Sequence, residues 1–167
     1  AGDPKVPETS TVGKVQGLAP VNATVIASIP QEVIDLQEEG RHGEATARLT
    51  RALEKARGKS QAPLYFARAI SYRAEGKKID AAEDLDAAVR ADPDLVEAHV
   101  LLCRTYMDLT LWDDALESLE SLVEKAPSGE SYWLRAYTLS KKGRAKEAKA
   151  DYAKACTLGK KEACSRK

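Results

Sequence analysis

Few of the residue types that perform chemistry in proteins occur in this sequence of 167 residues, which contains three cysteines and two histidines. The histidines, His42 and His99, lie far from each other in the sequence and far from the cysteines Cys156 and Cys164. A structural zinc site needs four such ligands, so the sequence predicts no metal site. The third cysteine, Cys103, stands alone and is predicted to be a small buried apolar residue.

Motifs for catalysis are also missing from the sequence, which has no glycine-rich phosphate loop, no His-Glu-x-x-His, no nucleophile elbow and no EF-hand spacing. The adjacent acids Glu38-Glu39 and Asp113-Asp114 would point in different directions on a helix, so neither forms an acid pair. We therefore predict no catalytic residue and no cofactor, and we expect that the protein is not an enzyme.

The elements that carry these residues recur along the chain with steps of 34 and 33 residues. Five columns keep this register, and an accidental repeat in a helical bundle would not persist through all of them. The columns are Ala69/Cys103/Ala136, Tyr72/Tyr106/Leu139, Ala81/Ala115/Ala148, Leu85/Leu119/Tyr152 and Ala88/Leu122/Ala155.

Within each repeat the apolar spacing predicts two helices. Gly76 and Gly143 fall between the two helices, where a residue in the left-handed conformation can end the first one. Thr110 takes the equivalent place in the middle repeat. Each repeat is therefore predicted to be a helical hairpin.

These columns of small residues, Tyr and Ala, with Pro93 and Pro127 closing two of the units, resemble the tetratricopeptide repeat. The resemblance implies an all-α solenoid of stacked antiparallel hairpins. It gives a solenoid over residues 30–167 with a degenerate unit 30–58, full units 62–95, 96–128 and 129–160, and a short cap 161–167, preceded by an extended N-terminal arm or tether over residues 1–29.

The last unit also resembles the Sel1-like relatives of this family, in the pattern Ala-Cys156, Leu-Gly159 and Ala-Cys164. Gly159 is well placed to end the helix, after which residues 160–163 can turn the chain back. In Sel1-like repeats such cysteines form a disulfide, and this resemblance predicts a Cys156–Cys164 bridge. Two reduced cysteines in a cytoplasmic protein are the alternative.

In tetratricopeptide solenoids the first helix of each hairpin lines a concave groove that binds a protein or peptide. The resemblance therefore implies a partner-binding groove, and we expect its large apolar members to be exposed for an interaction. Coverage of some of them by the adjacent hairpin, Phe66 and Ile70 especially, is the alternative. Carried over position by position, the groove residues are Ile34, Gln37, Phe66, Ile70, Arg73, Val100, Arg104, Met107, Trp133, Tyr137 and Lys141.

Residues 1–29 are mildly apolar, contain several Gly and Pro, and show no helix caps. An extended segment of this kind can bind along a groove or add to a neighbouring subunit. We expect the arm to contact a partner protein or a second copy of the chain.

Charge is unevenly distributed along the chain, although the formal net charge is zero. Residues 75–130 contain 15 acidic and 5 basic residues, whereas residues 141–167 contain 10 basic and 3 acidic ones. A basic end can bind an anionic surface or an acidic neighbour, such as the acidic part of another copy. Its one aromatic residue, Tyr152, is assigned to packing by the repeat, so we expect no specific nucleic-acid binding.

No run of about 18 apolar residues occurs, so we expect no transmembrane segment. The polar, proline-containing start at Ala1 and the cysteine pair favour an exported protein, periplasmic or in the outer envelope, with a lipid anchor as a further option. A cytoplasmic location is the alternative.

Together these features predict a non-catalytic interaction scaffold or adaptor that acts as a subunit or assembly factor of a bacterial envelope complex. Two alternatives stay open at this point. One is a Sel1-like cell-wall-associated binding protein or enzyme, and the other is a binder of an anionic surface through the basic C-terminal end.

Overall fold

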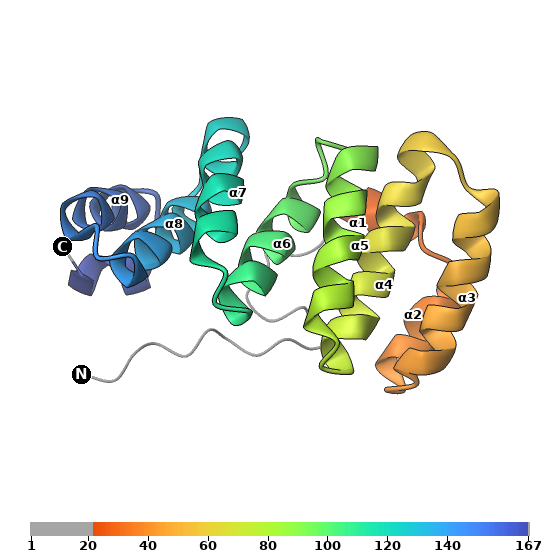
Figure 1. Cartoon of the computed structure of the whole chain (residues 1–167). Helices are drawn as coiled ribbons and strands as arrows, with labels where there is room; N and C mark the ends of the chain where they lie inside the picture. The colour runs from red at the N-terminus through yellow and green to blue at the C-terminus, as the bar shows by residue number, and fades with distance from the viewer. Residues whose placement is uncertain (1–21, 167) are drawn as a thin grey trace. The chain divides into compact units, whose positions relative to one another are not determined.

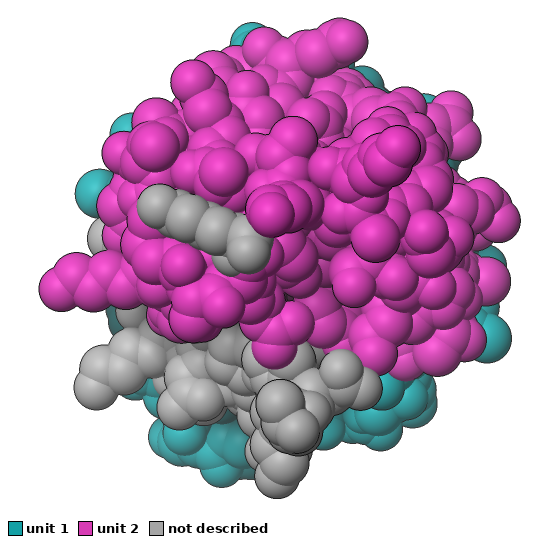
Figure 2. Space-filling view, turned by 90° about the vertical axis from the view of Figure 1, so that its left-hand side faces the viewer, with its two compact units in different colours: residues 1–98 teal, residues 99–167 magenta. Residues whose placement is uncertain are grey.

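A computed structural model of the chain describes residues 22–166. Within this range the chain forms helices joined by short turns, and no strand occurs there. The all-α fold of helical hairpins expected from the repeat is confirmed (Figure 1). By its contacts the chain divides into two compact units, residues 1–98 and 99–167, which Figure 2 distinguishes by colour.

The first unit contains two helical hairpins and a short helix before them. Its helices are α1 (Ala23–Ala27), α2 (Gln31–Glu38), α3 (His42–Lys55), the 3-10 helix η1 (Gly58–Gln61), α4 (Ala62–Ala74) and α5 (Lys78–Ala91). Helix α2 packs on α3, α3 on α4 and α4 on α5. The core consists of the small and branched residues of the repeat columns, with Ala69, Ala81 and Leu85 fully buried.

Helix α6 (Val96–Asp108) begins at the end of the first unit and runs into the second. The other helices of the second unit are α7 (Trp112–Lys125), α8 (Gly129–Lys141), α9 (Ala145–Thr157) and the 3-10 helix η2 (Lys161–Arg166). Helix α8 lies between α7 and α9, and η2 packs on α9. Ala115, Leu119 and Ala155 are fully buried in this core.

The turn that closes each first helix has one repeated geometry. Gly76 adopts φ +76°, and the N–H of Lys77 donates to the carbonyl of Tyr72 at 2.8 Å, as in a Schellman motif. The same left-handed conformation occurs at Gly40 and Gly143, and also at Thr110, with φ 59°. The predicted turn positions are therefore confirmed, including the threonine that replaces glycine.

Two features near the N-terminus differ from the sequence expectation. Residues 23–27, expected to be extended, form the short helix α1, because the Asn22 side chain caps it by accepting from the N–H of Thr24 at 3.0 Å. The longer connection before α4 is ordered as η1, where Lys59 pairs with Asp92 at 3.0 Å. Most of the expected arm, residues 1–21, lies outside the described residues.

Among the described residues, no helix is long and apolar enough to cross a membrane.

Candidate protein-interaction surface

Nine of the eleven predicted groove residues are buried, and only Arg73 and Lys141 keep substantial exposure. The expected exposure of the large apolar members is therefore wrong. The reason is that α4 packs between α3 and α5, and α8 between α7 and α9, which leaves little free surface on either helix. The exposed fractions of the five large apolar side chains are Phe66 0%, Ile70 7%, Met107 3%, Trp133 5% and Tyr137 8%. The other buried members are Ile34, Gln37, Val100 and Arg104.

In the first unit one predicted groove residue, Gln37, links the two hairpins. The Nε2 of Gln37 on α2 donates to the carbonyl oxygen of Ala67 and to the Oγ of Ser71 on α4, both at 2.7 Å. All three residues are buried. Gln37 is therefore a structural link between α2 and α4, because a buried amide requires such partners.

In the second unit four side chains follow one face of α8, at positions i, i+3, i+7 and i+11: Glu130, Trp133, Tyr137 and Lys141. The rings of Trp133 and Tyr137 stack with centroids 6.0 Å apart. The ammonium group of Lys141 lies 5.3 Å from the centre of the Tyr137 ring. We call these four residues the α8 face.

Two further cations join the α8 face from outside the helix. Glu130 forms ion pairs with Arg104 of α6 and with Lys160, whose Nζ is 2.6 Å from Glu130 Oε2. The Nζ of Lys160 also lies 5.1 Å from the centre of the Trp133 ring. Arg104 was predicted from the repeat, whereas Glu130 and Lys160 were missed because they come together only through tertiary packing.

The position of Lys160 depends on a close approach of the chain to Gly129. A Cβ atom at Gly129 would lie 3.0 Å from the carbonyl oxygen of Leu158 and 3.1 Å from the Cβ of Lys160. Gly159, with φ +89°, ends α9 as predicted and turns the chain toward the start of α8. A glycine at each of these two positions thus brings Lys160 to Trp133.

The groups of the α8 face that reach the surface are mainly cationic. Trp133 and Tyr137 are buried, whereas Lys141 is exposed and Lys160 keeps about a quarter of its side-chain surface. With Arg104, Lys141 and Lys160 against Glu130, the group has a net charge of +2. Ammonium groups at a surface can form charge-assisted hydrogen bonds with carboxylates.

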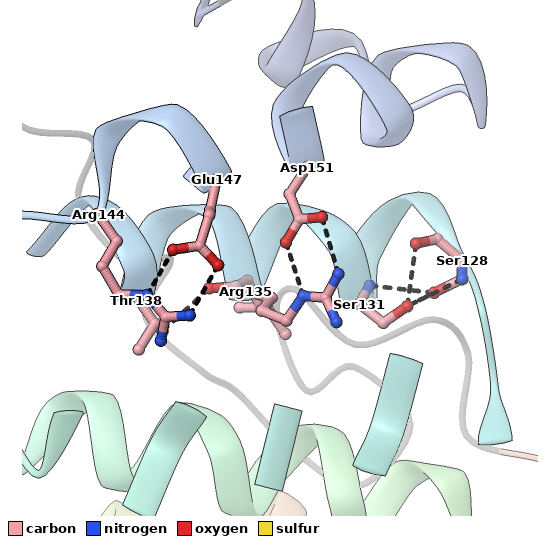
Figure 3. Close-up of polar contacts among 8 residues, drawn as sticks. Ser128, Ser131, Arg135, Thr138, Arg144, Glu147 and Asp151 are labelled. Carbon is pink, nitrogen blue, oxygen red and sulfur yellow. Dashed lines mark hydrogen bonds and ion pairs between the residues drawn. The ribbon is translucent and has the colours of Figure 1, made fainter. Parts of the chain in front are cut away.

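Arginine–aspartate pairs that were not predicted from the sequence join the two helices of a hairpin. In α8–α9, Arg135 donates from Nε and Nη2 to the two carboxylate oxygens of Asp151 at 2.6 and 2.8 Å (Figure 3). Arg68 makes the same bidentate pair with Asp84 in α4–α5 at 2.7 and 2.8 Å. The side-chain hydrogen bonds to these aspartates raise the pKa of both arginines.

The sequence itself contains a clue to these pairs, because Arg68 and Asp84 recur 67 residues later as Arg135 and Asp151. That distance is the sum of the two repeat steps. The middle repeat has Leu102 and Ser118 at the equivalent positions. The pair therefore does not form a column that all three units share.

The cysteines Cys156 and Cys164 lie at disulfide distance, with sulfur atoms 2.02 Å apart and Cα atoms 4.9 Å apart. The turn at Gly159 brings η2 back against α9, and Ala163 of η2 is fully buried. Cys103 is buried, as expected, and its burial raises the pKa of the thiol to about 12.

A cavity of about 310 Å³ in the first unit contains none of the predicted groove residues. It is lined mainly by α1, η1 and the segment after α5, including Val25, Ser28, Pro63 and Leu95. The helices α1 and η1, which form much of its lining, were not predicted from the sequence.

Comparison with known proteins supports the repeat assignment. Two family models described as tetratricopeptide repeat match residues 72–139 and 129–161. No curated protein matches the sequence. The Sel1-like resemblance of the cysteine pair stays a prediction.

Solved structures share the fold at low sequence identity. A crystal structure of MamA has a TM-score of 0.72 at 19% identity, with 83% of this chain and 80% of that chain covered. A MamA RS-1 double mutant has a TM-score of 0.70 at 16% identity, covering 83% and 77%. TTC0263, a tetratricopeptide-repeat protein of Thermus thermophilus, has a TM-score of 0.54 at 18% identity, covering 85% and 98%. With two matching family models and this shared architecture, residues 72–161 of the chain are tetratricopeptide repeats.

Proposed function

We propose that this protein is a non-catalytic interaction scaffold that binds an extended, acidic segment of another protein at the α8 face. The observation that carries this proposal is the alternation of cations and rings in the order Lys160, Trp133, Tyr137 and Lys141. Lys141 and Lys160 are the members of this group that reach the surface, where they can pair with the carboxylates of such a segment.

The α8 face is held in place by packing before any partner arrives. Trp133 and Tyr137 are fixed by their burial, and a tilted ring contact joins Trp112 of α7 to Tyr137 at 6.4 Å. Arg104 and Lys160 are fixed by their ion pairs with Glu130. A preordered surface costs less conformational entropy on binding, which favours recognition of a flexible segment.

Variants of the exposed cations test this proposal better than truncation of the rings. Trp133→Ala or Tyr137→Ala would remove a buried ring and cost about 3–5 kcal/mol of stability, so lost binding could reflect unfolding. The double variant Lys141→Gln/Lys160→Gln removes two positive charges and leaves the rings. Lys55→Gln/Lys78→Gln removes two exposed lysines of the first unit and serves as the matched control.

Capture of partner proteins from a lysate of the native host, followed by mass spectrometry, is the measurement. We expect the Lys141→Gln/Lys160→Gln variant to lose partners that the wild type and the control variant both retain. Retention of the same partners by all three proteins would show that the α8 face is not the binding site.

We further propose that the protein is exported and works as a subunit or assembly factor of an envelope complex, with Cys156 and Cys164 oxidised in the cell. Disulfides persist in oxidising compartments and are rare in the cytosol. Mass spectrometry of protein alkylated in intact cells before lysis tests this. A bridged pair in the periplasmic fraction is expected, and two alkylated thiols in a cytosolic fraction would contradict it.

A further inference from the structure

The loop between Cys156 and Cys164 has Lys160 at its centre, four residues from each cysteine. The Cα atoms of the two cysteines lie 4.9 Å apart, whereas a continuous helix would separate them by about 12 Å. The bridge therefore requires the chain to fold back within this loop. The same loop passes close to Gly129 at the start of α8, which brings Lys160 to Trp133.

Noncovalent contacts attach η2 to α9 only weakly. All six residues of η2 lie in the described part of the chain, and Ala163 is the buried one among them. The guanidinium carbon of Arg166, an exposed residue, lies 5.9 Å from the centre of the Tyr152 ring on α9. Hydrogen bonds in a 3-10 helix have poor geometry, so such a helix is stable only in short pieces. The disulfide is therefore the strongest link between the end of the loop and α9.

Backbone hydrogen bonds hold the loop in its turn while the bridge is closed. The N–H of Gly159 donates to the carbonyl of Cys156 and the N–H of Lys160 to that of Ala155, both at 3.0 Å. At the other side of the loop, the N–H of Ala163 donates to the carbonyl of Lys160 at 3.0 Å. Gly159 is exposed, so water competes for these groups once the loop opens. Contacts of this kind can open locally, without unfolding of the rest of the unit.

The ammonium group of Lys160 depends on this backbone for its place. Its Nζ is 2.6 Å from Glu130 Oε2 and 5.1 Å from the centre of the Trp133 ring. The side chains of Lys160 and Glu130 are 24% and 22% exposed. An ion pair that reaches solvent contributes little free energy, and a lysine loses the rotamer freedom of a long side chain when it is fixed. These two contacts alone are therefore too weak to hold the loop against α8.

We propose that Cys156 and Cys164 are positioning residues, whose bridge holds the ammonium group of Lys160 at the α8 face. Opening of the bridge releases η2 and, with it, Lys160. The group then loses one positive charge, while Glu130 keeps its ion pair with Arg104. The consequence for binding rests on the proposed function, because a smaller positive charge lowers the affinity only for an acidic segment that binds at the α8 face.

Reduction by dithiothreitol, a dithiol, opens the bridge in the full chain. The S–S bond breaks, the two sulfurs take up two electrons and two protons from the dithiol and become thiols, and the dithiol becomes a cyclic disulfide. Cys103 is already a thiol, so this treatment changes only the bridge. The variant Cys156→Ser/Cys164→Ser opens the loop without a reductant. Circular dichroism checks that the reduced protein and each variant stay folded.

The indole N–H resonance of Trp133 in a ¹H–¹⁵N spectrum reports on the ammonium group of Lys160. Two indole resonances are expected, one for each tryptophan, and the variant Trp112→Phe assigns them. A cation at 5.1 Å from the ring centre polarises the ring and shifts its resonances. We expect reduction to shift the Trp133 resonance, and the double serine variant to show the same shift. An unchanged Trp133 resonance in the reduced protein would overturn the proposal.

A double-mutant cycle separates positioning of Lys160 from a general loosening of the C-terminus. Lys160→Gln should shift the Trp133 resonance in the oxidised protein, and reduction of this variant should then cause at most about half of the wild-type shift. Lys160→Arg keeps a cation and should restore the response to reduction. Lys161→Gln removes an exposed lysine of η2 and is the matched control, which should respond as the wild type does. A full response to reduction in Lys160→Gln would overturn the proposal.

Binding of a decaglutamate peptide tests the consequence for the α8 face. We expect reduction to lower the affinity of the wild type by up to about fivefold, as for the loss of one exposed ion pair, and to leave that of Lys160→Gln unchanged. If Lys141→Gln/Lys160→Gln bound the peptide as well as the wild type, the proposed function would fail, and the resonance shifts would still decide the positioning of Lys160. Equal affinity of the oxidised and reduced wild type, for a peptide that the double variant binds less tightly, would overturn the link between bridge and binding.

Discussion

At the scale of single residues, this protein places similar ion pairs in different surroundings. Arg135 and Asp151 form a bidentate pair in which Asp151 is only 7% exposed. Arg144 and Glu147 make a pair of the same geometry on the surface of the same hairpin. The first pair joins two helices and is largely buried, whereas the second is local and exposed. A buried carboxylate that loses its partner cannot be solvated.

We therefore expect Arg135→Ala to lower the free energy of unfolding by about 2 kcal/mol, since it leaves Asp151 buried without its partner. Arg144→Ala is the matched control and should cause a much smaller loss, because water solvates Glu147. Urea denaturation followed by circular dichroism measures both. Equal losses would show that burial of the pair contributes nothing.

Cys103 gives a second prediction at this scale. Its thiol is buried, and this burial raises its pKa to about 12, so almost no thiolate exists at neutral or mildly alkaline pH. With Cys156 and Cys164 bridged, we expect iodoacetamide at pH 8 to leave the native protein unmodified and to add one label after denaturation. Rapid labelling of Cys103 in the folded protein would contradict its burial.

At the scale of elements, the turns between the two helices of each hairpin have a residue in the same left-handed conformation, so the turn of one repeat predicts the turn of the next. A residue that ends a helix in the left-handed conformation is most often glycine, because a side chain there costs about 1–2 kcal/mol. Gly143 follows this rule. Thr110 has the same left-handed conformation although it carries a side chain, so its φ of 59° is unfavourable.

Exchanging these residue types should therefore have opposite effects. Gly143→Thr should destabilise the protein by about 1–2 kcal/mol, since no neighbouring atom would obstruct its Cβ and only the backbone is strained. Thr110→Gly should stabilise it by a smaller amount, about 0.5 kcal/mol, because glycine also gains freedom in the unfolded chain. Thermal denaturation compares the two, and a destabilising Thr110→Gly would refute the argument.

At the scale of the whole molecule, stability should vary along the chain. Helix α1 has five residues and none of them is buried, whereas α4 and α8 each contain seven buried residues. A short helix without buried contacts is marginal in water. Helices with a buried side open only with the rest of their unit.

Native-state hydrogen exchange followed by mass spectrometry should therefore show fast exchange in α1 and the slowest exchange in α4 and α8. Peptides from α3 and α7 are internal references, because each has one exposed and one buried side. Protection of α1 equal to that of α8 would contradict the expected order.

The repeat, the helices of each hairpin and the turns at Gly76, Thr110, Gly143 and Gly159 could be predicted from the amino-acid sequence, because they depend on local spacing and on backbone conformation. The exposure of Trp133 and Tyr137 could not be predicted in this way, because it depends on how closely α7 and α9 pack against α8. The meeting of Lys160 with Glu130 and Trp133 likewise required the close approach at Gly129. Periodicity specifies which side of a helix is apolar, but only tertiary packing decides how much of that side the neighbouring helices cover.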